Sequence, residues 1–164
     1  MASMQKNKGS GYERDVAKFL STLYGETFIR TIGSGAFIGG KNQSRLGYLT
    51  ESQSRSHKGD VTPPDSFYHA NIECKFYQDF KFNQVFTGKC PVLDKWIEQV
   101  IEVEEAGDVN IIFMKFNRKG QYVAYQGKSI PTDKALHYRD DWYFMSFDKF
   151  FEYYSEQFKS ACAK

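Results

Sequence analysis

Three charged residues have types and a spacing suited to cutting a phosphodiester bond. Asp60 is followed thirteen residues later by Glu73, and Lys75 stands two residues beyond Glu73. Mg²⁺ prefers hard oxygen ligands and keeps several waters, so a few carboxylates can hold it. The bound ion activates water and stabilises charge on phosphate, while a lysine can hold or deprotonate that water. We therefore predict that Asp60, Glu73 and Lys75 converge on Mg²⁺, for which Mn²⁺ can substitute.

Two predicted strands must position these side chains. Residues 60–62 begin one strand, the Pro-Pro-Asp-Ser segment 63–66 is a turn, and residues 67–77 return as the next strand. Side chains alternate along a strand, so Glu73 and Lys75 share one face. The opposite face is apolar and carries Ala70, Ile72, Cys74 and Phe76.

Helices are predicted on either side of this hairpin. A helix capped by Ser10, with Glu13 completing a capping box, ends at Gly25 and leads into a strand at 27–32. The later elements are a helix at 92–106, strands at 109–116, 121–125 and 142–145, and a final helix capped by Ser146 with an aromatic core-facing stripe. The order αβββαββ(β)α favours an α/β (α+β) domain with a central mixed sheet flanked by helices.

Length and composition set the limits of the architecture. The 164 residues suit a single domain, 1–164, and 15 Phe with 11 Tyr predict an aromatic core. We expect segments 1–8 and 160–164 to be flexible and segment 36–59 to form a long basic loop or insertion. No apolar run approaches the roughly 18 to 20 residues that a membrane span needs. Three cysteines without a metal or disulfide spacing indicate a reducing, cytoplasmic (intracellular) location.

The net charge is only +2, so the distribution of charge is more informative than its sum. The segment 41–58 carries Lys41, Arg45, Arg55 and Lys58 against the single acid Glu51, whereas residues 98–108 are acidic. A basic face opposed to an acidic one suits a protein that presents one side to phosphates.

Three motifs, in order, resemble a known nuclease superfamily. Gly59-Asp60-Val61 with Ile72-Glu73-Cys74-Lys75 resembles the PD-(D/E)xK signature. The segments Lys8-Gly-Ser-Gly-Tyr-Glu-Arg14 and Arg30-Thr-Ile-Gly-Ser-Gly35 resemble motifs of the archaeal Holliday-junction resolvases. The loop before Asp60 is longer than in the archaeal form, and bacterial resolvases carry an insertion in a comparable region, so the subfamily stays open.

The resemblance implies a restriction-endonuclease-like core and a set of site residues. Glu13, Asp60 and Glu73 would bind metal directly or through water, the Cys74 carbonyl would add a ligand, and Lys75 would be the catalytic lysine. Arg30 and Ser34 would lie beside the scissile phosphate. Together with the basic residues above, the predicted DNA contacts are Lys8, Arg30, Ser34, Lys41, Arg45, Arg55 and Lys58.

Each of these residues also has an ordinary interpretation. Glu13 could serve only the capping box. Asp65, the literal Pro-Asp aspartate, rivals Asp60, although turn chemistry explains it better. Glu73 and Lys75 could be a weak ion pair on a solvated strand face. Gln99, on the predicted second helix, is either a plain polar residue or a residue that orients active-site water.

The leading hypothesis is a Mg²⁺-dependent endodeoxyribonuclease that nicks branched DNA as a Holliday-junction resolvase. Paired cuts on two strands would suit a homodimer. One alternative is a restriction-like or repair endonuclease acting on duplex DNA. The other is an inactive DNA-binding module of the same fold, against which the complete set of Asp60, Glu73 and Lys75 argues, because a decayed site could lose such costly like charges.

Overall fold

The structure is a computed structural model that describes residues 4–32 and 58–164, with side chains from residue 8 onward. Its elements, in chain order, are α1 (Met4–Tyr24), β1 (Ile29–Arg30), β2 (Val61–Thr62), the short 3-10 helix η2 (Asp65–Phe67), β3 (Ala70–Tyr77), α3 (Phe82–Phe86), α4 (Pro91–Glu102), β4 (Val109–Phe116), β5 (Gly120–Gln126), β6 (Leu136–Arg139), β7 (Trp142–Ser146) and α5 (Phe147–Cys162).

The described strands form one seven-stranded mixed sheet in the order β1-β2-β3-β4-β5-β7-β6. Strands β3 and β4 run parallel, with Glu73 opposite Ile112, and the other neighbouring strands pair antiparallel. Parallel neighbours need a long crossover, and here the chain between β3 and β4 forms α3 and α4. The mixed sheet flanked by helices that the sequence predicts is therefore confirmed.

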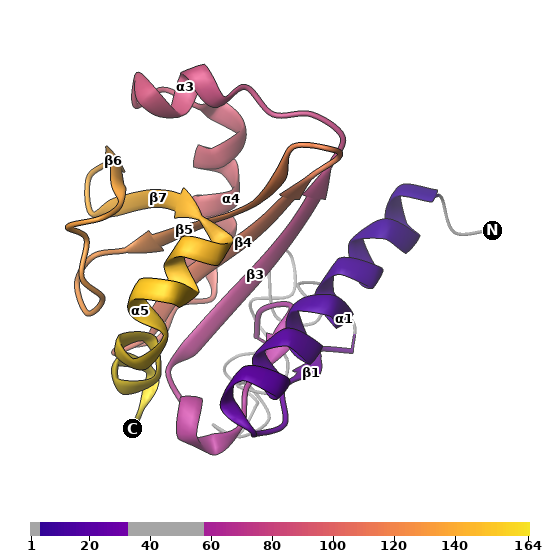
Figure 1. Cartoon of the computed structure of the whole chain (residues 1–164), viewed down its shortest axis with the longest axis vertical. Helices are drawn as coiled ribbons and strands as arrows, with labels where there is room; N and C mark the ends of the chain where they lie inside the picture. Colours follow the sequence, from indigo (N-terminus) through magenta and orange to yellow (C-terminus); the bar gives the residue numbers. More distant parts are fainter. Residues whose placement is uncertain (1–3, 33–57) are drawn as a thin grey trace.

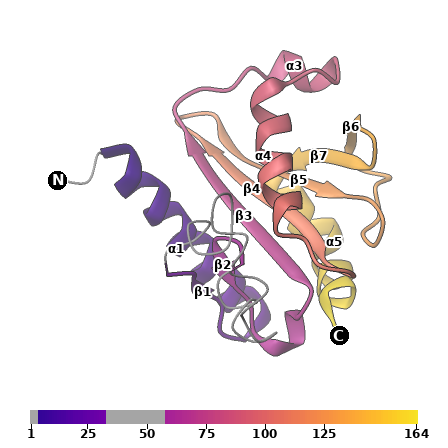
Figure 2. The same ribbon diagram turned by 180° about the vertical axis from the view of Figure 1, so that it is seen from behind.

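Helices cover both faces of the sheet. Helices α1 and α5 lie on one face and α4 lies on the other, as the two opposite views show (Figures 1 and 2). Strand β4 is buried on both sides: Ile111 and Phe113 join the core under α1 and α5, whereas Ile112 and Met114 join the core under α4. This double burial explains its nearly continuous apolar sequence.

Helix α1 begins earlier than the sequence suggests. It starts at Met4, so Ser10 and Glu13 are interior residues and the predicted capping box is wrong. Residues 4–8, for which we expected flexible chain, are helical. The segment before Ser10 is polar and has no apolar period, so a pattern search could not extend the helix upstream.

The C-terminal half agrees with the predicted elements, with a few differences. Strand β4 has the predicted bounds, and the aromatic stripe of α5 is buried in the core. Helix α4 ends at Glu102 rather than 106, and α3 and β6 were not predicted. Residue 162 was expected in a flexible tail, but Cys162 is a fully buried residue of α5 whose carbonyl accepts a hydrogen bond from the His69 N–H.

In the described part of the chain, none of the helices is long and apolar enough to cross a membrane. Cys74, Cys90 and Cys162 are all buried and unbridged.

Candidate active site

Asp60 is held where the chain enters β2. Its N–H donates to the Ile72 carbonyl over 2.8 Å, and its Oδ2 accepts a hydrogen bond from the Cys74 N–H over 2.8 Å. The preceding Gly59 has φ +70°, and a Cβ there would lie 2.6 Å from the Ile72 carbonyl oxygen. This close approach requires glycine. Backbone geometry therefore fixes the Asp60 carboxylate against β3.

Glu73 and Lys75 project from the same face of β3, as strand alternation predicts. The Lys75 Nζ lies 3.0 Å from Glu73 Oε1 and donates to Gln99 Oε1 of α4 over 2.6 Å. Their side chains are 17 % and 14 % exposed, so neither is an ordinary solvated surface group. Two residues earlier on this face, Asn71 donates to the Val100 carbonyl of α4. Helix α4 thus fixes the row of polar groups along β3.

The carboxyl groups of Asp60 and Glu73 are close enough to affect each other's protonation. Burial, together with the negative charge and a hydrogen bond of Asp60, raises the pKa of Glu73 from 4.5 to about 8, although the Lys75 ammonium opposes the rise. Burial and a neighbouring carboxylate both disfavour the charged form of a carboxyl group, and here they outweigh the nearby Lys75 ammonium. In the protein alone, Glu73 therefore retains a proton at neutral pH.

A third carboxylate approaches this pair from α1. Glu13 Oε2 accepts a hydrogen bond from Arg30 Nε of β1 over 2.5 Å. Burial and the Asp60 charge raise the pKa of Glu13, and the Arg30 guanidinium opposes that rise. The structure therefore joins residues from three sequence motifs, which contribute Glu13, Arg30 and Asp60, in one electrostatic cluster.

The donor set fits a hard divalent cation. In a strand, the N–H and C=O of one residue point toward the same neighbour, so the Cys74 carbonyl faces the same side as the N–H that meets Asp60. Among the described residues, no three His, Cys, Asp or Glu side chains are grouped closely enough to enclose a metal. Two carboxylates and one carbonyl are the hard oxygen donors that divalent cations such as Mg²⁺ and Ca²⁺ take.

The predicted DNA contacts are only partly within the described residues. Ser34, Lys41, Arg45 and Arg55 lie outside them. Lys8 is exposed on α1, and Arg30 is engaged with Glu13. The Asp65 alternative for the catalytic aspartate is an exposed residue of η2.

Lys58 is the clearest departure from the sequence prediction. Its ammonium lies 2.6 Å from Asp108 Oδ2, and the two side chains are 3 % and 2 % exposed. Lys58 is therefore not part of an exposed basic surface, and its assignment as a phosphate contact is corrected. Asp108, just before β4, had not been singled out, because nothing in the local sequence indicates a partner fifty residues away.

Gln99 is likewise more specific than predicted. Sequence reasoning offered it as a plain polar residue or a group that orients water, whereas the structure pairs its side chain with Lys75. Its position on α4 opposite β3 arises from the crossover between β3 and β4, which a helical pattern alone does not reveal.

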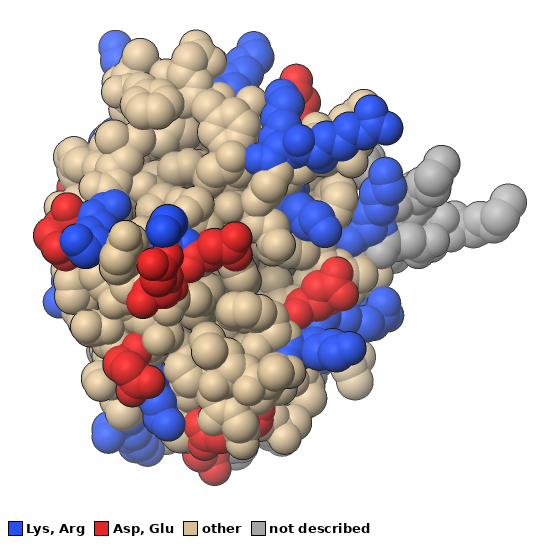
Figure 3. All heavy atoms as spheres, viewed as in Figure 1, with Lys and Arg blue, Asp and Glu red and all other residues tan. Residues whose placement is uncertain are grey.

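Basic side chains gather near this region on the molecular surface. Figure 3 shows Lys and Arg side chains at the upper right, over the hairpin that joins β4 and β5 and over the N-terminal half of α1. These segments contain Lys8, Arg14, Lys115, Arg118 and Lys119. The hairpin adjoins the end of β3, two residues past Lys75, so positive charge lies beside the candidate site.

The fold and the site define a class of protein. A mixed sheet flanked by helices, with an aspartate directly before one strand and a Glu-x-Lys pair on the next, is the arrangement of a PD-(D/E)xK nuclease with a restriction-endonuclease-like core. Comparison with family models agrees: the chain belongs to the family described as "Phage putative PDDEXK endonuclease", whose model matches residues 4–159. The protein is therefore a nuclease of the PD-(D/E)xK superfamily. Searches of curated proteins and of solved structures gave no match.

Proposed function

We propose that this nuclease is a Mg²⁺-dependent endodeoxyribonuclease whose preferred substrate is branched DNA. The observation that carries the proposal is the pairing of Asp60 and Glu73 beside Lys75, where burial and the Asp60 charge raise the pKa of Glu73 to about 8. A divalent cation would replace the proton on Glu73. PD-(D/E)xK nucleases generally use divalent metals, and the oxygen-only donor set favours Mg²⁺, with Mn²⁺ as its substitute.

The residues of the chain divide the work of hydrolysis. Asp60, Glu73 and the Cys74 carbonyl would hold the cation, which would supply activation of water and stabilisation of charge on the phosphate. Lys75 holds the attacking water or neutralises the developing negative charge on phosphorus. Gln99 limits the orientations of the Lys75 ammonium by accepting a hydrogen bond from it.

Glu13 and Arg30 complete the phosphate-binding side of the site. Glu13 would contribute to holding the metal, and Arg30 would contact the scissile phosphate. The short contact between them holds the guanidinium beside Glu13, whose carboxyl group is close enough to Asp60 to be affected by its charge. An arginine in this position can pair with two phosphate oxygens at once.

Branched DNA is proposed as the substrate because the Glu13 and Arg30 motifs, which resemble those of Holliday-junction resolvases, meet at the site. The basic surface over α1 and the β4–β5 hairpin provides nonspecific phosphate contacts, which suits recognition of shape rather than sequence. A homodimer would place two such sites for paired cuts on a four-way junction.

The test compares a four-way junction, a flap and a linear duplex, equal in length, in Mg²⁺, in Mn²⁺ and in EDTA. We expect cleavage that depends on the metal and favours the branched substrates. Equal cleavage of the linear duplex would refute the proposed preference for branched DNA and favour duplex DNA as the substrate. The assignment as a nuclease would be unaffected. Tight junction binding with no cleavage in either metal would overturn the enzyme and favour a DNA-binding module.

A further inference from the structure

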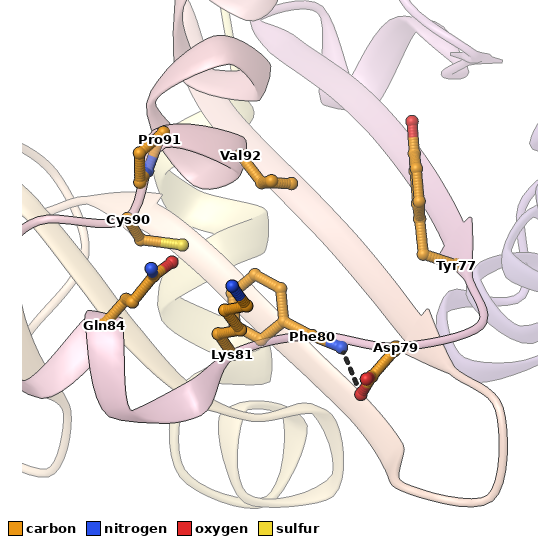
Figure 4. A pocket seen from close by; sticks show the side chains of 8 residues that line it. All are labelled: Tyr77, Asp79, Phe80, Lys81, Gln84, Cys90, Pro91 and Val92. Atoms are coloured by element: carbon orange, nitrogen blue, oxygen red, sulfur yellow. Dashed lines mark hydrogen bonds between the residues drawn. The ribbon is translucent and has the colours of Figure 1, made fainter.

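A cavity of about 330 Å³ lies at the end of the row of polar groups that begins with Glu73 and Lys75. Its lining comes from the end of β3, the following loop, α3 and the start of α4, and consists of Tyr77, Asp79, Phe80, Lys81, Gln84, Cys90, Pro91 and Val92. In Figure 4 the Tyr77 ring stands opposite Pro91 and Val92, with Phe80 and Lys81 between them.

Two elements, β3 and α4, lead from the candidate active site to the lining of the cavity. On β3, every second residue lies on the same face, which carries Glu73, Lys75 and Tyr77. Tyr77 therefore lies about 7 Å beyond Lys75 along the strand. On α4, Val92, Trp96 and Gln99 fall at positions i, i+4 and i+7, which share one face of a helix. Gln99 contacts Lys75, the Trp96 ring lies 4.9 Å from the Tyr77 ring, and Val92 lines the cavity.

The chemistry of the walls suits a planar ring system attached to a phosphate. Phe80 forms one wall and stacks on Phe116 at 4.4 Å between centroids, so this wall is rigid. Tyr77 forms the other wall; its ring contacts Trp96, but 40 % of the residue stays exposed, so part of the ring remains accessible. Lys81 brings positive charge to the rim, while the charge of Asp79 is offset by its ion pair with Lys119.

We propose that this cavity binds an unpaired nucleobase adjacent to the scissile phosphate. The inference rests on the proposed function, because it places the DNA strand at Lys75. A strand that continues past Lys75 reaches Tyr77 next, where a base stacks on the aromatic ring and Lys81 meets its phosphate. Base–aromatic stacking tolerates any base sequence, so the site would recognise unpaired structure rather than sequence. It would thereby provide a physical basis for a preference for branched DNA.

The first experiment measures cleavage kinetics on a fluorescein-labelled flap DNA in Mg²⁺. Tyr77→Ala is expected to raise KM about tenfold, near the lower end of the cost of losing one base–aromatic stack. Tyr77→Phe keeps the ring and should retain the wild-type KM. Tyr153→Ala is the matched control, because Tyr153 on α5 is equally exposed, at 39 %, and does not line the cavity.

The second experiment removes the base instead of the ring. An abasic nucleotide is placed on one side or the other of the scissile phosphate in the same flap. For the wild type, one of the two abasic substrates should raise KM about tenfold, and Tyr77→Ala should show no further rise with that substrate. The base site is refuted if each abasic substrate changes the KM of the wild type and the KM of Tyr77→Ala by the same factor. It is also refuted if neither abasic substrate changes the KM of the wild type.

The two proposals can fail separately. If the protein cuts the flap and neither Tyr77→Ala nor the abasic nucleotides change the KM, the proposed nuclease function stands and the base site is refuted. A chain that does not cut overturns the proposed function. In that event fluorescence anisotropy with the same DNAs still tests the cavity, because Tyr77→Ala should weaken binding of the intact flap and not of the abasic one.

Discussion

Two charged clusters meet at the tripeptide Lys58-Gly59-Asp60, and they differ in charge balance. On one side, the Lys58 ammonium is buried against Asp108, whose Oδ2 also accepts a hydrogen bond from the Glu105 N–H over 3.0 Å. On the other side, Asp60 faces Glu73, and burial and repulsion raise the pKa of Glu73 to about 8.

The difference separates structure from function. In the Lys58–Asp108 cluster the two buried charges neutralise each other, the partly exposed Glu105 carboxylate lies 3.5 Å from the same ammonium, and the pair fixes the chain beside β4. The Asp60–Glu73 cluster holds three carboxyl groups, since Glu13 also lies near Asp60, and the opposing charges of Lys75, Arg30 and Arg14 do not prevent the pKa values of Glu13 and Glu73 from rising. A buried excess of negative charge destabilises a fold unless a proton or cation neutralises it. The first cluster should therefore control stability and the second should control activity.

The largest expected effect is on activity, from Asp60→Asn. The amide oxygen can keep the hydrogen bond from the Cys74 N–H, but the metal loses a charged ligand. Cleavage of junction DNA in Mg²⁺ should fall by about 10³-fold or more, in line with the several kcal/mol that a catalytic metal supplies. Asp65→Asn, in the exposed η2, is the control and should cleave normally. Full activity in Asp60→Asn would contradict the site.

Breaking the other cluster should affect stability. Lys58→Met leaves the Asp108 carboxylate buried without its ammonium, which should cost about 3–5 kcal/mol in urea unfolding. Lys119→Met, which breaks an exposed ion pair with Asp79, should change stability little. Adding Asp108→Leu to Lys58→Met should recover most of the loss. A single Lys58→Met variant as stable as the wild type would show that the cluster is not an anchor.

The pH dependence should distinguish the clusters further. Because the pKa of Glu73 rises on folding from 4.5 to about 8, its proton stabilises the metal-free fold at pH values below 4.5, and this contribution is lost as pH rises through 8. Metal must displace the same proton. Below pH 8, Mn²⁺ affinity should therefore increase up to about tenfold for each unit by which the pH is raised. Calorimetric titration with Mn²⁺ measures this, and Glu73→Gln should show a much weaker pH dependence.

Gln99→Leu should have a smaller effect confined to the active cluster. Without the Gln99 carbonyl oxygen, the Lys75 ammonium loses one of its two fixed partners, and kcat should drop about tenfold, the scale of a hydrogen bond to a charged group. KM and the urea midpoint should stay near wild type. Glu98→Gln, at the preceding position on α4, is the control for a general disturbance of the helix. A change in stability without a change in kcat would assign Gln99 to structure alone.

The smallest effect should come from Lys8→Ala at the exposed start of α1. One phosphate contact fewer should weaken binding of junction and duplex DNA alike and reduce the slope of log affinity against log salt by about 1. Fluorescence anisotropy at several salt concentrations measures the slope. An unchanged slope would remove Lys8 from the DNA surface.

Local patterns determined much of this protein in advance. Glu73 and Lys75 share a face because the period of a strand is two, whatever it packs against. The apolar run of β4 and the aromatic stripe of α5 specify buried elements in the same way. The three motifs in order were also sufficient to indicate the nuclease superfamily, which the family comparison confirms.

Tertiary structure alone decided which charges meet. Lys58 and Asp108 are fifty residues apart, Lys75 and Gln99 are joined across the β3–α4 crossover, and the partner of Glu13 is Arg30 rather than a helix cap. A charged side chain in a sequence is compatible with solvent, phosphate or an ion pair, and the free-energy difference among these depends on burial. Burial is set by packing between distant segments, so the sequence could propose these side chains for chemistry but could not assign their partners.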